Sequence, residues 1–502
     1  MFKALFGELA IIDAHHGCAR VTVDSAIWRG IGEALREGKI DLLSEWADDR
    51  ILHCALYEAK TRQACVASLP ITAGKAPSLA VFHPPAIRLE RAITDLFGIS
   101  LVGLPDSRPW LDHGNWPVQA PLGGGGLPFT APRPYTFLDA VGPSLHQIPV
   151  GPVHAGIIEP GHFRFTASGE TVVRLEERLG YVHRGVEKLL NGAPVEEAAR
   201  IVGRASGDST VAYSLAFARA VELAFDFAPS SRAVWLRAIM AELERLANHL
   251  GDIGAICNDA AFSMMHAECG ILRELTLRAC DQAFGHRLMM DRIVPGGVRA
   301  DPTRAGVDAL LSLLRALRER FPELIELYVN TASLQDRTVG TGVVSEALAS
   351  EFAAGGYVGR ASGRAFDARE ALPYPPYDVL PIQVALRKEG DVDARVWVRI
   401  LEIQHSVAWL DAALHSLPAG EVLTPVIPRH SATEATTLVE GFRGDVLCHV
   451  RVSGHGRIER CHLRDPSWFQ WPLLEAAIDG NIVADFPLCN KSFNCSYAGH
   501  DL

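Results

Sequence analysis

The sequence has no Cys-x-x-Cys pair, no long basic run and no stretch of about 20 uninterrupted apolar residues. The lack of a Cys-x-x-Cys pair argues against a zinc site of the usual paired spacing. The lack of a basic run, together with the net charge of −11, argues against a nucleic-acid-binding protein. The lack of a long apolar stretch predicts that no helix of the chain spans a membrane. The motifs GxSxG and HExxH, the P-loop and the kinase signatures are also missing, so none of these enzyme classes is indicated.

Charged residues interrupt the most apolar part of the chain. Residues 246–267 include Asp252 and Asp259, which favours a helix of a soluble bundle. The N-terminus carries Glu8 and has no small-residue cleavage site, so it is a poor signal peptide. We therefore expect a cytoplasmic protein.

Ten cysteines are spread along the chain. Because free cysteines are most often core residues, we predict unpaired, buried thiols in a reducing compartment. Cys489 and Cys495, six positions apart, leave open a metal enzyme that uses both thiolates, although zinc sites rarely have that spacing.

The chain is long for a single hydrophobic core, and its 502 residues predict two or three folding units. We expect an α+β protein in three parts. These are a small α/β domain over residues 1–117, a Gly/Pro-rich linker over 118–148, and a mainly helical domain with β hairpins at its ends over 149–502.

Two helix patterns stand out in the third part. One places six apolar side chains on one helix face: Leu236, Ile239, Met240, Leu243, Leu246 and Leu250. The other, over residues 307–330, contains Pro322, which predicts a helix boundary or a kink.

Several polar residues are candidates for chemistry. His154, Glu159 and His162 lie in one Gly/Pro-bounded turn, where a histidine can exchange a proton near neutral pH or simply be hydrogen-bonded. A helix pattern sets Glu242, Arg245 and His249 on one face, which indicates either a solvated row of ion pairs or a buried polar network. Two later glycine-rich segments interleave charged residues that need partners if buried: Arg337, Arg360, Arg364, Asp367 and Arg369.

Two groups of motifs resemble known families. The segment from Glu90 to Leu111, followed by Trp116 and Pro117, resembles the signature of the 30-kDa subunit of respiratory complex I. Later motifs follow the order found in the 49-kDa subunit of complex I and in the large subunits of energy-converting nickel–iron hydrogenases such as formate hydrogenlyase. These motifs are GPVHAGIIEPGHFRF, LGYVHRGVEKLL, LRAIMAELERLANHL, VPGGVR, QDRTVGTGVV, GRASGRAFDAR and the C-terminal RCHLRDPSWFQWPLLEAAIDGNIVADFPLCNKSFNCSYAGHDL.

The chain departs from the hydrogenases at the metal ligands. In the active enzymes two Cys-x-x-Cys pairs hold the metals, and the corresponding positions here are Val202, Ala205, Ser496 and Gly499. A shift of the second match by one residue would place a cysteine, Cys495, at only one of these four positions. Since thiolates bind nickel and iron in this chemistry, we expect a lost nickel–iron site, no directly bound metal and no hydrogenase activity.

The resemblance to the 49-kDa subunit implies a quinone site built from a hairpin histidine, a tyrosine and an aspartate. The histidine is matched by His154 or, from its place before the strand, by His162, and Asp259 lies near the aspartate position. Gly203 stands at the tyrosine position beside Arg204. We therefore expect catalytic roles for His162 and Asp259, and contacts to a quinone from His154, His162, Arg204 and Asp259.

The resemblance implies a subunit of a membrane-associated, energy-converting oxidoreductase complex. Electrons would come from iron–sulfur clusters in a small partner subunit and pass to a quinone or another acceptor. Other hydrophilic subunits and ion-pumping membrane subunits would be further partners, and they would hold the chain on the cytoplasmic face of the inner membrane. The resemblance to NADH–quinone oxidoreductases also implies an association with NAD binding. In this sequence, however, the GTG and GRASG segments lack the strand–GxGxxG–helix context of a dinucleotide site.

In this mechanism His162 and Asp259 supply protons as the acceptor gains electrons. Arg204 and the group formed by Arg360, Asp367 and Arg369 carry the charge change toward the membrane. The alternative is a non-redox scaffold or conformational coupler of an ion-translocating complex. For either function we expect exposed apolar patches where partner subunits bind.

Overall fold

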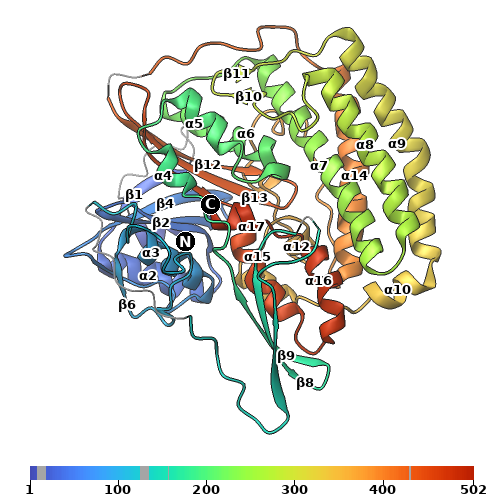
Figure 1. Ribbon diagram of the computed structural model, residues 1–502. Coiled ribbons are helices and arrows are strands. Elements are labelled where there is room, and N and C mark those ends of the chain that lie inside the picture. The colour runs from blue at the N-terminus through green and yellow to red at the C-terminus, as the bar shows by residue number, and fades with distance from the viewer. Residues whose placement is uncertain (8–17, 125–134, 157, 429–430) are drawn as a thin grey trace.

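The expected α+β class is confirmed by a computed structural model, which describes residues 1–7, 18–124, 135–156, 158–428 and 431–502 (Figure 1). Residues 125–134 of the predicted linker lie outside the described residues. No helix among the described residues is long and apolar enough to cross a membrane.

The N-terminal part is a four-stranded sheet flanked by helices. The strands follow the order β1-β4-β3-β2, in which only β1 and β4 run parallel. A short parallel pair, β5 and β6, lies beside this sheet. The elements are α1 (Phe2–Phe6), β1 (Ala19–Thr22), α2 (Ser25–Arg36), β2 (Asp41–Ala47), β3 (Ile51–Glu58), β4 (Gln63–Pro70), β5 (Lys75–Pro77), α3 (Ile87–Phe97) and β6 (Ser100–Val102).

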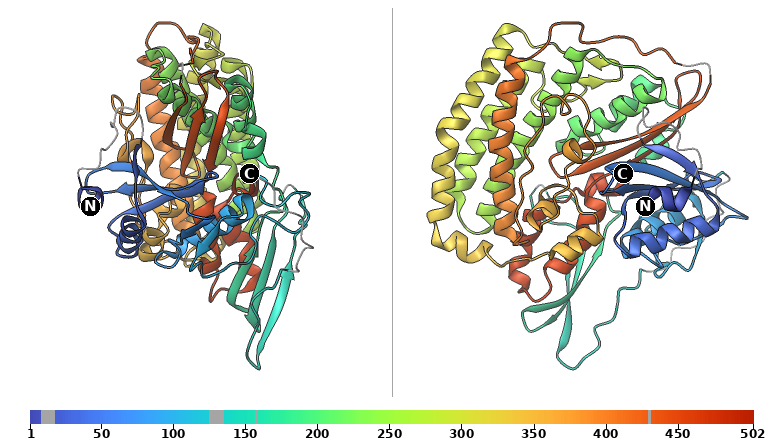
Figure 2. Two further views of the ribbon diagram at one scale, coloured as in Figure 1. Left: turned by 90° about the vertical axis from the view of Figure 1, so that its left-hand side faces the viewer. Right: turned by 180° about the vertical axis from the view of Figure 1, so that it is seen from behind.

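A three-stranded antiparallel sheet follows and extends away from the rest of the molecule (Figures 1 and 2). Its strands are β7 (Leu145–Val150), β8 (His162–Ser168) and β9 (Thr171–Arg178). Phe163 and Phe165 of β8 pack against Phe486, the first residue of α16 (Phe486–Phe493), with ring centroids 4.8 and 4.9 Å apart. These aromatic contacts attach the base of the sheet to the C-terminal helices.

Long helices form the opposite side of the molecule (Figure 1). The longest are α7 (Ser231–Asp259), α8 (Ser263–Phe284), α9 (Arg304–Asn330) and α14 (Val392–His415). The six apolar residues predicted on one face of α7 are all buried. The helix α9 continues through Pro322, because buried neighbours such as Phe321 and Leu324 hold the residues on both sides of it in the core.

Shorter elements connect the long helices. They are α4 (Val186–Leu190), α5 (Val195–Val202), α6 (Thr210–Ala224), β10 (Ile293–Val294), β11 (Gly297–Val298), α10 (Ala332–Thr338), α11 (Glu346–Glu351), α12 (Gly356–Ala361) and α13 (Ala368–Ala371). After the C-terminal sheet come α15 (Ser467–Ala477), α16 and α17 (Tyr497–Asp501).

The C-terminal sheet joins the two ends of the sequence. It consists of β12 (Thr433–Glu440), β13 (Asp445–Val452) and β14 (Ile458–Arg464), and α6 packs against it. The N-terminal sheet covers its other side, where Ser44 Oγ lies 2.9 Å from His462 Nε2 and Arg464 donates to the carbonyl of Leu43 at 2.7 Å. The N-terminal domain is thus fixed to strands that come more than 400 residues later in the chain.

Candidate functional site

Three loops meet near the C-terminus and form what we call the three-loop site. They are the hairpin loop between β7 and β8, the loop from Gly203 to Ser209, and the loop from Asn494 to Ser496 together with the first turn of α17. Ser206 Oγ lies 2.9 Å from Ser496 Oγ, and the backbone N–H of Ala498 donates to Glu159 Oε2 at 3.2 Å. Arg184 donates to the carbonyls of Ala205 and Ala498 at 2.6 and 3.3 Å. The fold therefore brings all three loops together.

The four positions that correspond to metal ligands are buried and closely packed. Val202 and Ala205 are 0% exposed. A Cβ atom added to Gly499 would lie 2.4 Å from Asp465 Oδ2, whose carboxylate accepts a hydrogen bond from Tyr213 at 2.7 Å. Because these positions provide no thiolate, and a side chain at Gly499 would collide with Asp465, they do not fit a nickel–iron centre.

The nearby thiols do not replace the missing ligands. Burial raises the pKa of Cys495 well above its ordinary value, and its Sγ lies 3.9 Å from Gln470 Oε1. Cys489 instead lies beside Gly342 and Arg395. In the part of the chain that the structure describes, no group of three His, Cys, Asp or Glu side chains is arranged to hold a metal ion.

Both hairpin histidines are bound to the hairpin backbone. His154 Nε2 lies 2.7 Å from the carbonyl oxygen of Gly161, and His162 Nδ1 lies 3.2 Å from that of Gly151. Since a carbonyl only accepts, His162 carries its proton on Nδ1, and its Nε2 accepts from Arg164 Nε at 3.2 Å. Burial lowers the pKa of His162, and the Arg164 charge adds to this effect, so the ring is neutral near pH 7.

The other two predicted residues lie on different surfaces. Asp259 is the last residue of α7, where burial raises its pKa and the charge of Lys491 on α16 opposes that shift. Arg204 is exposed, and its guanidinium donates to both carboxylate oxygens of Asp291 at 2.7 Å. A larger side chain at Gly203 would meet Ser214, because an added Cβ would lie 2.9 Å from Ser214 Oγ.

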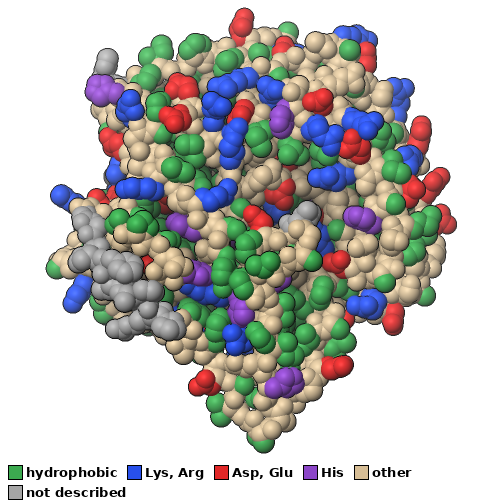
Figure 3. Space-filling model, viewed as in Figure 1, with side chains coloured by type: hydrophobic (Ala, Val, Ile, Leu, Met, Phe, Trp, Pro, Cys, Tyr) green, Lys and Arg blue, Asp and Glu red, His purple; other side chains and the backbone are tan. Residues whose placement is uncertain are grey.

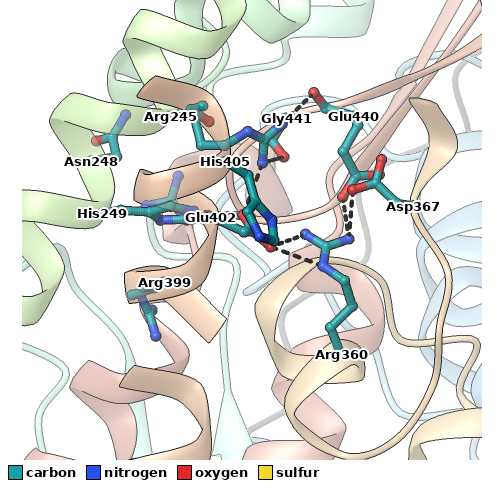
Figure 4. Close-up of polar contacts among 12 residues, drawn as sticks. Arg245, Asn248, His249, Arg360, Asp367, Arg399, Glu402, His405, Glu440 and Gly441 are labelled. Carbon is teal, nitrogen blue, oxygen red and sulfur yellow. Dashed lines mark hydrogen bonds and ion pairs between the residues drawn. The ribbon is translucent and has the colours of Figure 1, made fainter. Parts of the chain in front are cut away.

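A buried ion-pair network connects α7, α12 and α14 (Figure 4). Its members are Glu242, Arg245, His249, Arg360, Asp367, Arg369, Glu402 and Glu440, all less than 5% exposed. Arg360 pairs with Glu402 at 2.7 Å, with Glu440 at 2.8 Å and with Asp367 at 3.3 Å. His249 Nε2 lies 2.7 Å from Glu402 Oε2. Of the two interpretations of the α7 face, the buried polar network is therefore correct.

The network contains one group that titrates near neutrality. Burial and the Asp367 carboxylate raise the pKa of Glu440 to about 7, although Arg360 opposes this. In Glu402, burial alone would raise the pKa, but Arg360 and His249 hold it well below its usual range. At the other end of the network, Glu242 accepts from Arg369 at 2.7 Å and from Tyr377 at 2.8 Å. Protonation of Glu440 near pH 7 would therefore remove its charge from the pair with Arg360, while the pairs of Arg360 with Glu402 and Asp367 would remain.

A second chain of polar contacts leads from the three-loop site to this network. Ser206 donates to Asp208, Asp208 pairs with Arg443 at 2.5 Å, and Arg443 donates to the carbonyl of Asn494. Asn494 donates to Asp252 at 2.8 Å, and Arg399 contacts the other oxygen of Asp252 at 3.2 Å. Asp252 and Arg399 lie one helical turn from His249 and Glu402 respectively. Sequence reasoning missed this path because all its links except Ser206 to Asp208 join residues far apart along the chain.

Glu244 should make the stability of the fold depend on pH. It accepts hydrogen bonds from the backbone N–H groups of Val211 and Ala212 at the start of α6, while burial raises its pKa to about 8. The folded state keeps a proton that the unfolded state releases near 4.5, so the free energy of unfolding should fall as pH rises from about 4.5 to 8. Urea unfolding across this range should show a smaller fall for Glu244→Gln than for the wild type. Equal falls would show that Glu244 is ionised in the folded protein.

Hydrophobic side chains are exposed around the hairpin and the loops beside it. Figure 3 shows such side chains gathered on this face of the molecule, with histidines among them. The exposed hydrophobic residues of this region include Val141, Val153, Ile158, Val173, Tyr181 and Leu189. Exposed apolar patches of this kind often mark protein–protein interfaces.

Comparisons with known proteins extend over both parts of the chain. Residues 21–123 match the family described as respiratory-chain NADH dehydrogenase, 30 Kd subunit, and residues 259–431 and 426–501 match the 49 Kd subunit of the same enzyme. Formate hydrogenlyase subunit 5 of Escherichia coli (strain K12) is 30% identical over 435 residues, which cover 85% of this chain and 76% of the relative. The carbon monoxide-induced hydrogenase of Rhodospirillum rubrum is 30% identical over 352 residues, 70% of this chain and 98% of the relative. An NADH-quinone oxidoreductase subunit of Dehalococcoides mccartyi (strain CBDB1) is 30% identical over 343 residues, 67% and 92% of the two chains.

Proposed function

Because the chain belongs to the family of complex I 30-kDa and 49-kDa subunits and energy-converting hydrogenase large subunits, with both parts fused in one polypeptide, we propose that it is an electron-transfer subunit of a membrane-associated oxidoreductase complex without hydrogenase activity. Its partners are an iron–sulfur small subunit, other hydrophilic subunits and ion-pumping membrane subunits. Through them it lies on the cytoplasmic face of the membrane.

The observation that carries this proposal is the combination of a changed metal site and a polar path leading from it. Val202, Ala205, Ser496 and Gly499 offer no thiolate, whereas the path from Ser206 through Asp252 to the ion-pair network is continuous apart from one helical turn. Burying so many charged groups costs free energy, which supports a role for them beyond packing. We therefore assign the path to charge movement during acceptor reduction.

The acceptor in this proposal is a quinone or another molecule bound near the hairpin. His162 lies in this hairpin with both ring nitrogens engaged by Gly151 and Arg164, and its Nε2 becomes available to the acceptor when Arg164 turns toward the incoming negative charge. An acceptor that gains electrons becomes negative, and a nearby negative charge raises the pKa of a histidine. His162 then takes up a proton and delivers it to the acceptor, with Asp259 as a second proton donor. Arg204, which pairs with Asp291 at the surface, responds to the charge change together with the ion-pair network.

A second candidate function is a non-redox conformational coupler. The observation in its favour is that the four ligand positions are closed by packed side chains, with Val202 and Ala205 fully buried. In this case the ion-pair network responds to movements of the partner subunits and no electron passes through the chain.

Metal analysis, redox titration and quinone extraction of the native complex, purified through this chain, separate the two functions. Electron transfer predicts iron–sulfur clusters and bound quinone, and no stoichiometric nickel. Stoichiometric nickel would show that the interpretation of Val202, Ala205, Ser496 and Gly499 is wrong. A complex that contains neither clusters nor quinone would favour the coupler.

A further inference from the structure

A cavity of about 430 Å³ lies between the N-terminal domain and the C-terminal end of the chain. One wall is α3, with Leu89 and Ile93, and another is formed by Trp116 and Trp468. The residues just before and within α4 complete it, with Lys188 among them. Pockets for small molecules are typically about 300–1,000 Å³, mostly apolar and often placed between domains. In size, lining and position the cavity matches this class.

Two polar groups in this apolar lining have no hydrogen-bond partner. Glu45 on β2 lines the cavity and is 1% exposed, and both of its carboxylate oxygens are unpartnered within the described ranges of the chain. The indole N–H of the neighbouring Trp46, also part of the lining, is buried and unpartnered as well. By contrast, Glu90 on α3 accepts hydrogen bonds from Ser78, Leu79 and Ala80. The fold therefore supplies hydrogen-bond donors to the Glu90 carboxylate but not to the Glu45 carboxyl group.

The protonation state of Glu45 narrows the ligand class. Burial raises the pKa of its carboxyl group well above the ordinary value, and the nearby Glu90 adds to the shift, so the group is protonated and neutral. A protonated carboxyl has one O–H donor and a carbonyl acceptor. A donor in a mostly apolar cavity recognises an acceptor oxygen. A charged ligand would lose its hydration without an ionic partner at Glu45, and it would have to compete for charged lining residues that already have partners, such as Arg460, which pairs with Glu187 at 2.8 Å. The complementary ligand is uncharged and carries a carbonyl.

We propose that this cavity is a binding site for an uncharged, mostly apolar small molecule whose carbonyl oxygen accepts a hydrogen bond from Glu45. The proposal does not depend on the electron-transfer proposal, because Glu45 belongs to neither the three-loop site nor the ion-pair network. A ligand here would contact the N-terminal domain and the C-terminal residues at once. Its affinity would therefore depend on how the two parts fit together.

The purified full chain can be tested with prodan, an uncharged fluorescent naphthalene that carries one ketone. We expect saturable binding of one probe per chain, with a blue-shifted emission and energy transfer from the tryptophans of the lining. Glu45→Leu should weaken binding about tenfold through loss of one hydrogen bond, whereas Glu45→Gln, which keeps a donor, should bind nearly as well as the wild type.

Filling the cavity gives an independent readout. Ala92 of α3 lines the cavity and is 5% exposed, so Ala92→Phe should abolish saturable binding.

The melting temperature of Glu45→Leu tests whether this variant folds. It should be higher than that of the wild type, because the substitution removes an unpartnered buried carboxyl. The proposal is overturned if the wild type binds no prodan saturably, which would leave water as the occupant. It is equally overturned if Glu45→Leu binds as tightly as the wild type.

Discussion

Replacing Arg360 with alanine should lower the free energy of unfolding by about 3–5 kcal/mol. The guanidinium of Arg360 is fully buried and contacts Glu402, Glu440 and Asp367 (Figure 4). Without it, three carboxyl groups lie in the interior with less compensating charge, and a buried charge that loses its partner is far more costly than the pair was favourable. Urea unfolding monitored by circular dichroism measures the difference.

An exposed ion pair provides the control for Arg360. Arg304 pairs with Asp308 one helical turn away, and its side chain is 90% exposed. Arg304→Ala should change stability by no more than about 1 kcal/mol, since exposed pairs contribute little. Arg360→Lys keeps the charge but loses the planar fork, and we expect an intermediate loss. If Arg360→Ala were as mild as Arg304→Ala, the carboxyl groups would have to be protonated already in the wild type.

Replacing His162 with alanine in the assembled complex should reduce acceptor turnover by roughly 10²–10⁴-fold, the usual contribution of a positioned general acid or base. The reason is that His162 is the neutral imidazole fixed between Gly151 and Arg164 at the edge of the three-loop site. Turnover is measured as reduction of a short-chain quinone by the purified complex supplied with a chemical reductant.

Matched variants distinguish chemistry from hairpin stability. His146 lies on the adjacent strand β7 and is exposed, so His146→Ala should leave turnover unchanged. Asp259→Asn should slow turnover less than His162→Ala and shift its pH profile, because the raised pKa of Asp259 no longer contributes. Unchanged turnover in His162→Ala would remove the proton-transfer role from this residue and favour the coupler.

The fold class and several elements could be predicted because their signals are local. The repeated apolar residues of α7 are three or four positions apart, and all six that were expected on one face are buried. Pro322 is a case in which a local signal did not decide the outcome. Its tendency to break a helix is local and predicts a boundary or a kink. Contacts made by Phe321 and Leu324 in the core outweigh this tendency, and the helix continues through the proline.

The candidate site could be predicted only in part. The pattern of Glu242, Arg245 and His249 left open a solvated row of ion pairs or a buried network on α7. The partner that decides between them, Glu402, comes from α14, more than 150 residues after His249. No spacing rule connects such positions. Asp208 and Arg443 are separated by 235 residues, and their ion pair follows from tertiary packing alone. The unpartnered Glu45 could not have been recognised either, because its position in β2 does not reveal which groups surround it.

The contact between the N-terminal sheet and the C-terminal strands also has a consequence for biosynthesis. Ser44 and its partner His462 are 418 residues apart. At a synthesis rate of roughly 5–20 residues per second, strand β2 leaves the ribosome about 20–80 s before β14 exists. During this interval Leu43 and Trp46, which later pack against Leu438 and Leu447, remain uncovered. We therefore expect chaperones to bind the nascent chain during translation.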